Sequence, residues 1–291
     1  MPRLFCFGLG YSARALADRL KSDGWTIAGT CRGADKQDAL QAAGIQAFLF
    51  DRDRPLADPA RALEGATHVL VSVPPDSDGD PVLDRHDREI VAARGISWIG
   101  YLSTTGVYGD TGGAEVDESS PLNPTSERSL ARVTAESRWL ALHGDRGLPL
   151  HVFRLAGIYG PGRSAIDQVR AGSARRIAKP GHLFSRIHVD DIAGVLAASI
   201  ARPHPGAVYN VCDDAPAPQA DVIAYACELL GVPAPPLVPF AEAKGQMAEM
   251  ALSFWRDNRR VSNRRIKEEL SVRLRYPTYR EGLRAILKPY A

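Results

Sequence analysis

Residues 8–13 read Gly8-Leu9-Gly10-Tyr11-Ser12-Ala13, and they join an apolar run to a helical pattern near the start of the chain. A G-x-G-x-x-A turn between a strand and a helix is typical of dinucleotide-binding βαβ units. Gly8 allows the tight turn, Gly10 lets the backbone approach a pyrophosphate, and Ala13 allows close helix–strand packing. The free amides that open the helix favour an anion. The cofactor-binding candidates of this turn are Gly8, Gly10, Tyr11, Ser12 and Ala13; the alternative is an ordinary glycine-containing turn.

Short apolar runs alternate with helical patterns through the first half of the chain. The runs are apolar on both faces, as in a parallel sheet that helices cover on both sides. We predict strands at residues 3–8, 25–30, 45–50, 67–73, 96–102 and 148–155. We predict helices at residues 12–21, 36–43, 81–93 and 126–142. This alternation predicts a doubly wound α/β sheet.

The pattern changes after residue 156, where Gly and Pro become frequent. The Pro-rich stretch 232–240 is predicted to be an irregular connection, because proline interrupts helices and central strands. Further elements are predicted at residues 190–200, 208–211, 219–230 and 262–270, the last with Ser262 as its N-cap. We therefore predict a dinucleotide-binding domain over residues 1–156, which also receives about 182–211. A small substrate lobe would comprise residues 157–181 and 212–291.

The composition of the 291-residue chain excludes several classes of function. Lys and Arg number 36 and Asp and Glu 34, so the net charge of +2 gives no reason to expect nucleic acid or an acidic membrane as a partner. No apolar run approaches the ~20 residues that span a bilayer, and the N-terminus reads as a strand rather than a signal peptide. Four cysteines without metal-ligand spacing (Cys6, Cys31, Cys212 and Cys227) favour reduced thiols over disulfides or zinc. We expect a cytoplasmic protein that binds a small molecule and no metal.

The end of the second predicted strand bears on the choice of cofactor. NAD-binding units usually place Asp or Glu there, about 20 residues after the glycine turn, to bind the ribose 2′-hydroxyl. This chain has Arg32 instead and no carboxylate, and a guanidinium suits a 2′-phosphate. We therefore predict NADP as the cofactor, with NAD as second choice, unless Arg32 is only a solvated loop charge. Asp51, after the third strand, is a candidate for the adenine edge, and Val73, at the end of the fourth, is a further cofactor-binding candidate.

Three later segments carry a family resemblance. They are Ser103-Thr104-Thr105-Gly106-Val107-Tyr108-Gly109, the stretch RLAGIYGPGR at 154–163 and the stretch RIHVDDIA at 186–193. In this order they resemble the extended short-chain dehydrogenase/reductase family, the NAD(P)-dependent epimerase/dehydratase group. The G-x-G-x-x-A turn is more similar to the atypical branch of that family. The resemblance runs from Gly8 to about residue 283, and it implies a Rossmann-type sheet, a small C-terminal substrate lobe and hydride transfer to or from nicotinamide.

The resemblance also implies which positions would carry the chemistry. The family's catalytic hydroxyl falls on Thr104, with Ser103 adjacent, although a polar strand end is the alternative. Its Tyr general acid/base and the Lys four residues later fall on Arg128 and Arg132. The spacing keeps both side chains on one helix face, but arginine stays protonated and cannot exchange protons.

Other roles remain open for the two arginines, and the proton donor is unassigned. Arg132 could hold the ribose and phosphate side of the cofactor, and Arg128 could bind a carboxylate or phosphate of a substrate, or both could be solvated. Tyr108, Tyr159 and Glu127 are candidate proton donors, whereas His188 is expected to be structural. The Asp-Glu pair of the family's dehydratases is replaced by Thr105-Gly106, which argues against sugar-nucleotide dehydration.

Two functions follow as hypotheses. The first is an NADP(H)-dependent oxidoreductase or epimerase that acts on a small or nucleotide-linked carbonyl or hydroxyl substrate. The second is a non-catalytic NAD(P)-binding sensor or scaffold, suggested by the loss of the Tyr and the Lys. The resemblance makes a homodimer through the helices at 81–93 and 126–142 plausible. The basic stretch 256–267 is expected to be a solvated helix.

Overall fold

The computed structural model describes residues 1–287 and divides into two compact units. Unit 1 contains Met1–Thr104, Glu127–Arg154 and Ile192–Tyr209. Unit 2 contains Thr105–Ser126, Leu155–Asp191 and the chain from Asn210 onward. Each unit has buried apolar clusters of its own, so each is described by itself.

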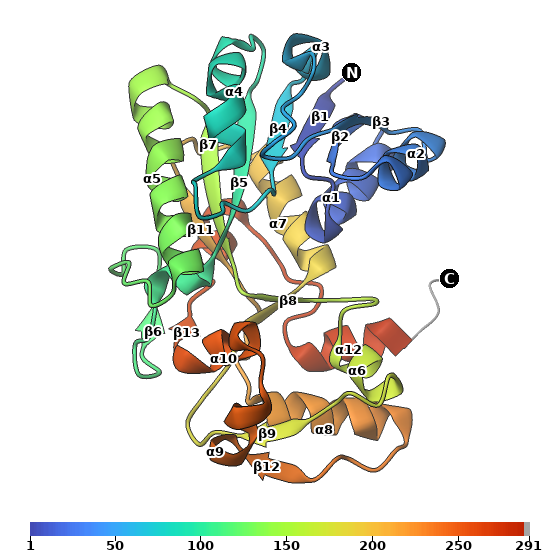
Figure 1. The fold of residues 1–291 in the computed structure, drawn as a ribbon, viewed down its shortest axis with the longest axis vertical. Helices are drawn as coiled ribbons and strands as arrows, with labels where there is room; N and C mark the ends of the chain where they lie inside the picture. Colours follow the sequence, from blue (N-terminus) through green and yellow to red (C-terminus); the bar gives the residue numbers. More distant parts are fainter. Residues whose placement is uncertain (288–291) are drawn as a thin grey trace. The chain divides into compact units, whose positions relative to one another are not determined.

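A seven-stranded sheet forms the framework, in the order β11-β7-β5-β4-β1-β2-β3 (Figure 1). The strands are β1 (Arg3–Phe7), β2 (Thr26–Cys31), β3 (Gln46–Leu49), β4 (His68–Val71), β5 (Trp98–Thr104), β7 (Leu150–Leu155) and β11 (Val208–Val211). Strand β1 pairs in parallel with both β2 and β4, so the direction of winding reverses between β1 and β4. In open α/β sheets, ligands bind at the carboxyl ends of the strands beside such a reversal. This confirms the predicted Rossmann-type doubly wound sheet.

Helices follow the strands of the sheet in the alternation that the sequence predicts. They are α1 (Tyr11–Ser22), α2 (Ala34–Ala42), α3 (Pro59–Leu63), α4 (Pro81–Ala92), α5 (Glu127–Arg146) and α7 (Val189–Ala201). Helix α4 begins where it does because the carboxylate of Asp80 accepts hydrogen bonds from the amides of Val82 and Leu83, and Pro81 occupies the first helical position.

The core of unit 1 packs α3, α4 and α5 against one face of the sheet. Its largest members include Phe7, Tyr101 and Trp139, all fully buried. Burial raises the pKa of Asp80, whose carboxylate accepts a hydrogen bond from Trp139 Nε1 at 3.0 Å. The buried aromatic side chains and the hydrogen bond between Trp139 and Asp80 together fix α4 and α5 against the sheet.

Unit 2 is built from short parallel strand pairs and helices (Figure 1). The pairs are β8 (Gly157–Tyr159) with β10 (Arg186–His188), β9 (Arg176–Ala178) with β12 (Leu237–Pro239), and β6 (Glu115–Val116) with β13 (Arg260–Val261). The helices are α6 (Ala165–Arg170), α8 (Gln219–Leu230), α9 (Phe240–Ala243), α10 (Glu249–Arg256), α11 (Arg264–Leu270) and α12 (Tyr279–Leu287). A buried cluster joins α6, α8 and α12.

Three local predictions in unit 2 need correction. The basic stretch 256–267 is not one solvated helix, because it runs from the end of α10 through β13 to the start of α11. Helix α11 begins at Arg264 with Asn263, not Ser262, at its N-cap position, although the Arg264 amide donates to Ser262 Oγ at 3.5 Å. The Pro-rich stretch 232–240 is not wholly irregular, because Leu237–Pro239 forms β12. Proline is tolerated there since each strand of a two-stranded pair has a free edge.

Two general properties concern the whole described chain. Among residues 1–287, no helix has the length and apolar character needed to cross a membrane. The four cysteines are buried, and none of them forms a disulfide.

Candidate functional site

The glycine turn after β1 is held between two neighbouring strands. Gly8 has φ +86°, and a Cβ there would come within 2.9 Å of Ser72 Oγ and 3.0 Å of Val73 Cγ2. The Gly8 amide donates to Thr30 Oγ1 at 2.8 Å, and Ser72 Oγ donates to the Gly8 carbonyl oxygen. Any side chain at this position would therefore meet both a strained backbone and a close neighbour.

Gly10 serves a different purpose from Gly8. It occupies the N-cap position of α1 with an ordinary φ of −83°, and its side-chain position meets no atom of residues 1–287 within 4 Å. Helix α1 has no side-chain cap and no acidic residue in its first turn. The first amides of a helix have no acceptor within the helix, and they carry the positive end of the helix dipole. Such a helix start fits the pyrophosphate of a dinucleotide.

A cavity of about 750 Å³ lies at the carboxyl ends of β1, β2, β3 and β4. The predicted cofactor-binding residues that line it are Gly8, Gly10, Arg32, Asp51 and Val73. Tyr11, Ser12 and Ala13 belong to the first turn of α1 and are not among the lining residues. Ala13 is fully buried, as close packing of helix and strand requires. The volume lies within the range of about 300–1,000 Å³ typical of ligand pockets.

Two cations on this cavity form no ion pair within residues 1–287, although Asp51 and Asp53 line the same cavity and Asp35 lies in the first turn of α2. Arg32 and Lys36 are exposed and line the cavity at the start of α2, whose N-cap is Gly33. Within the described chain, neither side chain lies within ion-pair distance of a carboxylate. The sequence prediction named Arg32 but missed Lys36, although its position four residues later is a usable signal.

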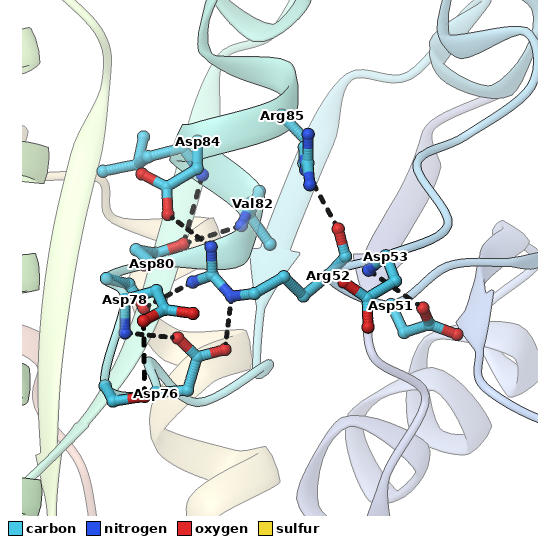
Figure 2. Close-up of polar contacts among 12 residues, drawn as sticks. Asp51, Arg52, Asp53, Asp76, Asp78, Asp80, Val82, Asp84 and Arg85 are labelled. Atoms are coloured by element: carbon cyan, nitrogen blue, oxygen red, sulfur yellow. Dashed lines mark hydrogen bonds and ion pairs between the residues drawn. The ribbon is translucent and has the colours of Figure 1, made fainter.

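Arg52, a third cation on the cavity, is fully engaged by acidic residues (Figure 2). Its Nε lies 2.6 Å from Asp76 Oδ2, its Nη1 lies 3.0 Å from Asp84 Oδ2, and its Nη2 donates to the Gly79 carbonyl oxygen. The hydrogen bond to Asp76 is the main reason that the pKa of Arg52 is raised. Arg52 therefore ties the segment after β3 to the segment before α4, and its charge is already balanced.

Asp51 is also engaged within its own loop. Its carboxylate accepts hydrogen bonds from the amides of Asp53 and Arg54, and lies 2.8 Å from Arg54 Nη2. Its contact with an adenine edge stays a prediction.

The residues predicted to carry the chemistry within unit 1 lie on β5 and α5. Thr104 ends β5, and the Oγ of Ser103 is buried without a hydrogen-bond partner among the described residues. Arg132 Nη1 donates to the Leu102 carbonyl oxygen at 2.6 Å and to the Tyr101 hydroxyl at 3.2 Å. The structure therefore brings Arg132 to the end of β5, beside the predicted hydroxyl residues.

Arg128 on α5 and Tyr101 on β5 lie near Arg132 in the chain or in contact with it. Arg128 is exposed and lies one turn before Arg132 on α5. Tyr101 is fully buried, and burial raises the pKa of its hydroxyl. Its pairing with Arg132 therefore does not provide a proton donor that a substrate could reach.

The remaining candidate proton donors have varied surroundings. Tyr108 is 1% exposed and donates to Asn210 Oδ1 at 2.7 Å. The hydroxyl of Tyr159 donates to the Thr278 carbonyl oxygen at 3.4 Å, and burial raises the pKa of Tyr159. Glu127 is exposed in the first turn of α5. The two tyrosine hydroxyls already serve protein acceptors, so the proton donor stays unassigned.

His188 has the surroundings of a structural histidine. Its Nδ1 accepts a hydrogen bond from the Asp190 amide, and its ring packs 4.2 Å from the Tyr276 ring. Burial lowers the pKa of His188 to about 4, so the ring is neutral at pH 7.

Comparisons with known proteins agree with this geometry. The model of the NAD dependent epimerase/dehydratase family matches residues 88–212. Protein YeeZ from Escherichia coli (strain K12) is 29% identical over 245 residues, covering 81% of this chain and 86% of YeeZ. A conserved protein of unknown function from Silicibacter pomeroyi DSS is 54% identical, with a TM-score of 0.90 and 98% of each chain covered.

A more distant structure has the same fold. The dTDP-glucose 4,6-dehydratase from Bacillus anthracis is 17% identical, with a TM-score of 0.79, covering 98% of this chain and 95% of the dehydratase. The family model thus matches residues 88–212, and the dehydratase shares the fold of this chain.

Proposed function

We propose that the protein is an NADP(H)-dependent oxidoreductase or epimerase acting on a carbonyl or hydroxyl of a small or nucleotide-linked substrate. The observation that carries the proposal is the 750 Å³ cavity at the sheet reversal, which the glycine turn lines directly before the uncapped start of α1. The Bacillus anthracis dehydratase is described in complex with NAD, which supports a nicotinamide cofactor for this chain.

The preference for NADP rests on the cations at the end of β2. An adenosine 2′-phosphate needs fixed positive charge, and Arg32, Lys36 and the first amides of α2 supply it. The residue directly after β2 is Arg32, where NAD-binding units usually place the acidic residue that binds a free 2′-hydroxyl. Arg52 cannot replace these cations, because Asp76 and Asp84 already balance its charge.

The chain's own residues would hold the substrate and the cofactor in the positions that hydride transfer needs. A bound nicotinamide supplies or accepts the hydride. Thr104 would donate a hydrogen bond to the substrate oxygen, and Arg132 would fix the end of β5 through Leu102. Arg128 is exposed and suits an anionic group of the substrate. Proton exchange falls to a group other than Arg128 and Arg132, because a guanidinium does not give up its proton.

A second candidate function is a non-catalytic NADP-binding sensor or scaffold. The specific observation in its favour is that arginine stands at both positions where the family places its Tyr and Lys. This function needs the glycine turn but makes no use of Thr104.

Turnover separates the two functions. NADPH oxidation and NADP reduction would be followed at 340 nm with panels of aldehydes, ketones and alcohols. For an enzyme, we expect Thr104→Ala to lower turnover about 100-fold, as loss of one oxyanion donor does, with unchanged NADPH affinity. Thr104→Ser keeps the hydroxyl and should retain most of the rate. Equal rates for Thr104→Ala and the wild type would remove Thr104 from the mechanism, whereas NADPH binding without any turnover would support the sensor.

A further inference from the structure

Unit 2 contains a cavity of about 520 Å³ that no step above uses. Residues of β8, α6, β10, α8 and α12 line it. Much of its wall is apolar or aromatic, contributed by Ile158, Phe184, Val222, Ile223, Tyr279 and Leu283. A cavity of this size and character suits a small organic molecule.

The cavity wall also contains a guanidinium with unused donors. Arg186, on β10, donates from Nη1 to the carbonyl oxygens of Phe184 and Ala217, at 2.8 and 3.0 Å. These two bonds use both hydrogens of Nη1. Its Nε and Nη2 have no hydrogen-bond acceptor within residues 1–287, so the two parallel N–H groups of the Nε/Nη2 edge and the second N–H of Nη2 lack a protein partner.

The charge of Arg186 is poorly compensated. No described carboxylate lies within 4.0 Å of its guanidinium nitrogens, and burial lowers the pKa of Arg186. Asp213 favours the cation only through space. A buried cation without a direct partner is costly, and an anion at its open edge would offset that cost.

The carboxylate on the cavity wall is already occupied. Asp167 accepts hydrogen bonds from the amide and the hydroxyl of Ser164, at 2.8 and 2.6 Å, in the capping box that starts α6. Arg163 also lines the cavity and adds positive charge. The lining therefore favours an anion over a cation or a neutral polar group.

We propose that this cavity binds a small molecule with an apolar or aromatic body and one anionic group, a carboxylate or a phosphate, held by Arg186. A guanidinium edge with parallel N–H groups matches two oxygens of either anion. As a statement of substrate class the proposal rests on the proposed function, whereas the binding site itself does not.

The test uses the full-length protein and the fluorescent aromatic sulfonate 8-anilinonaphthalene-1-sulfonate in the presence of saturating NADPH, which keeps the probe out of the cavity of unit 1. We expect saturable binding, displaced by 4-phenylbutyrate or phenyl phosphate and not by the neutral 4-phenylbutanol. Whichever of the two anions displaces the probe at the lower concentration identifies the preferred group. Displacement by the alcohol as readily as by both anions would overturn the proposal.

Variants assign the binding to Arg186. Arg186→Gln should lower the affinity for 8-anilinonaphthalene-1-sulfonate at least tenfold. Arg176→Gln is the matched control, since Arg176 is also half-buried in unit 2, donates to the Pro235 carbonyl oxygen and does not line this cavity. Unchanged affinity in Arg186→Gln, or a loss only in Arg176→Gln, would place the site elsewhere.

A second variant keeps the test decisive if Arg186→Gln does not fold. Gln168 is exposed on α6 and lines the cavity, so Gln168→Trp removes no buried contact. The larger side chain should obstruct the cavity and lower the affinity for the probe at least tenfold. Wild-type affinity in Gln168→Trp would contradict the proposal. Anion binding by a protein that fails to bind NADPH would overturn the proposed function and leave this site standing; for that outcome the titration is repeated without NADPH.

Discussion

The glycine turn after β1 and the start of α5 belong to the same unit, yet they preserve very different amounts of the family pattern. The turn keeps Gly8 and Gly10, each with a separate steric reason. The start of α5 replaces a proton-exchanging pair by Arg128 and Arg132 while keeping the spacing of four residues. Under the proposed function, nucleotide binding and proton exchange are separate: the turn that would bind the cofactor is present, whereas the acid/base pair that the resemblance implies is not.

The largest effects are expected for substitutions at the two glycines of the turn. Gly10→Val should lower NADPH affinity about 100-fold or more with little change in stability, because its side chain meets no described protein atom and would occupy the ligand's space. Gly8→Val should instead destabilise the fold by roughly 2 kcal/mol or more, because φ is +86° and Ser72 Oγ is 2.9 Å from its Cβ. Titration and thermal denaturation of both variants provide the measurements. Unchanged NADPH affinity in Gly10→Val would show that the turn does not face a cofactor.

A smaller effect is expected for the cofactor preference. Arg32→Asp should lower the affinity for NADPH roughly 10- to 100-fold and leave the affinity for NADH unchanged or higher. The reason is that a carboxylate repels a 2′-phosphate and accepts a hydrogen bond from a 2′-hydroxyl. Arg19→Asp is the matched control, because Arg19 is exposed on α1 and does not line the cavity. If both affinities stay at wild-type values in Arg32→Asp, Arg32 is a bystander and the NADP preference is wrong.

The smallest effect concerns stability and separates the two arginines of α5. Arg132→Met removes the donor to the Leu102 carbonyl oxygen and the buried Tyr101 hydroxyl, so the free energy of unfolding should fall by about 1–3 kcal/mol. Arg128→Met, at an exposed position, should change it by about 0.5 kcal/mol or less. Chemical denaturation measures both. Equal losses would show that Arg132 is not the anchoring residue of the pair.

The sequence predicted local and periodic features well. The doubly wound sheet followed from apolar runs whose spacing is visible in the chain, and the predicted helix at 219–230 coincides with α8. The glycine turn could also be predicted, because strand, turn and helix are contiguous. Lys36 was missed although it lies only four residues after Arg32, since it was treated as an ordinary helix residue.

Features that depend on distant segments could not be predicted. Arg52 meets Asp76 and Asp84 because the segment after β3 reaches the segment after β4, although β1 and β2 separate these two strands in the sheet. Arg186 borders a cavity whose walls come from five separate elements, and its unused N–H groups are visible only in three dimensions. The N-cap position of α11 falls on Asn263 rather than Ser262, and the Asn263 side chain does not cap the helix but donates to the Cys212 carbonyl oxygen and to Asp214 Oδ1, which are distant in the sequence.

The most direct measurement is a titration of the purified protein with NADPH and with NADH, followed by nicotinamide fluorescence. The structure predicts saturable binding of NADPH at least tenfold tighter than that of NADH, because Arg32 and Lys36 have no carboxylate partner in the described chain. Equal affinities would contradict the NADP assignment. Binding of neither nucleotide would contradict the proposed function as a whole and would leave the turn at Gly8 and Gly10 to another ligand.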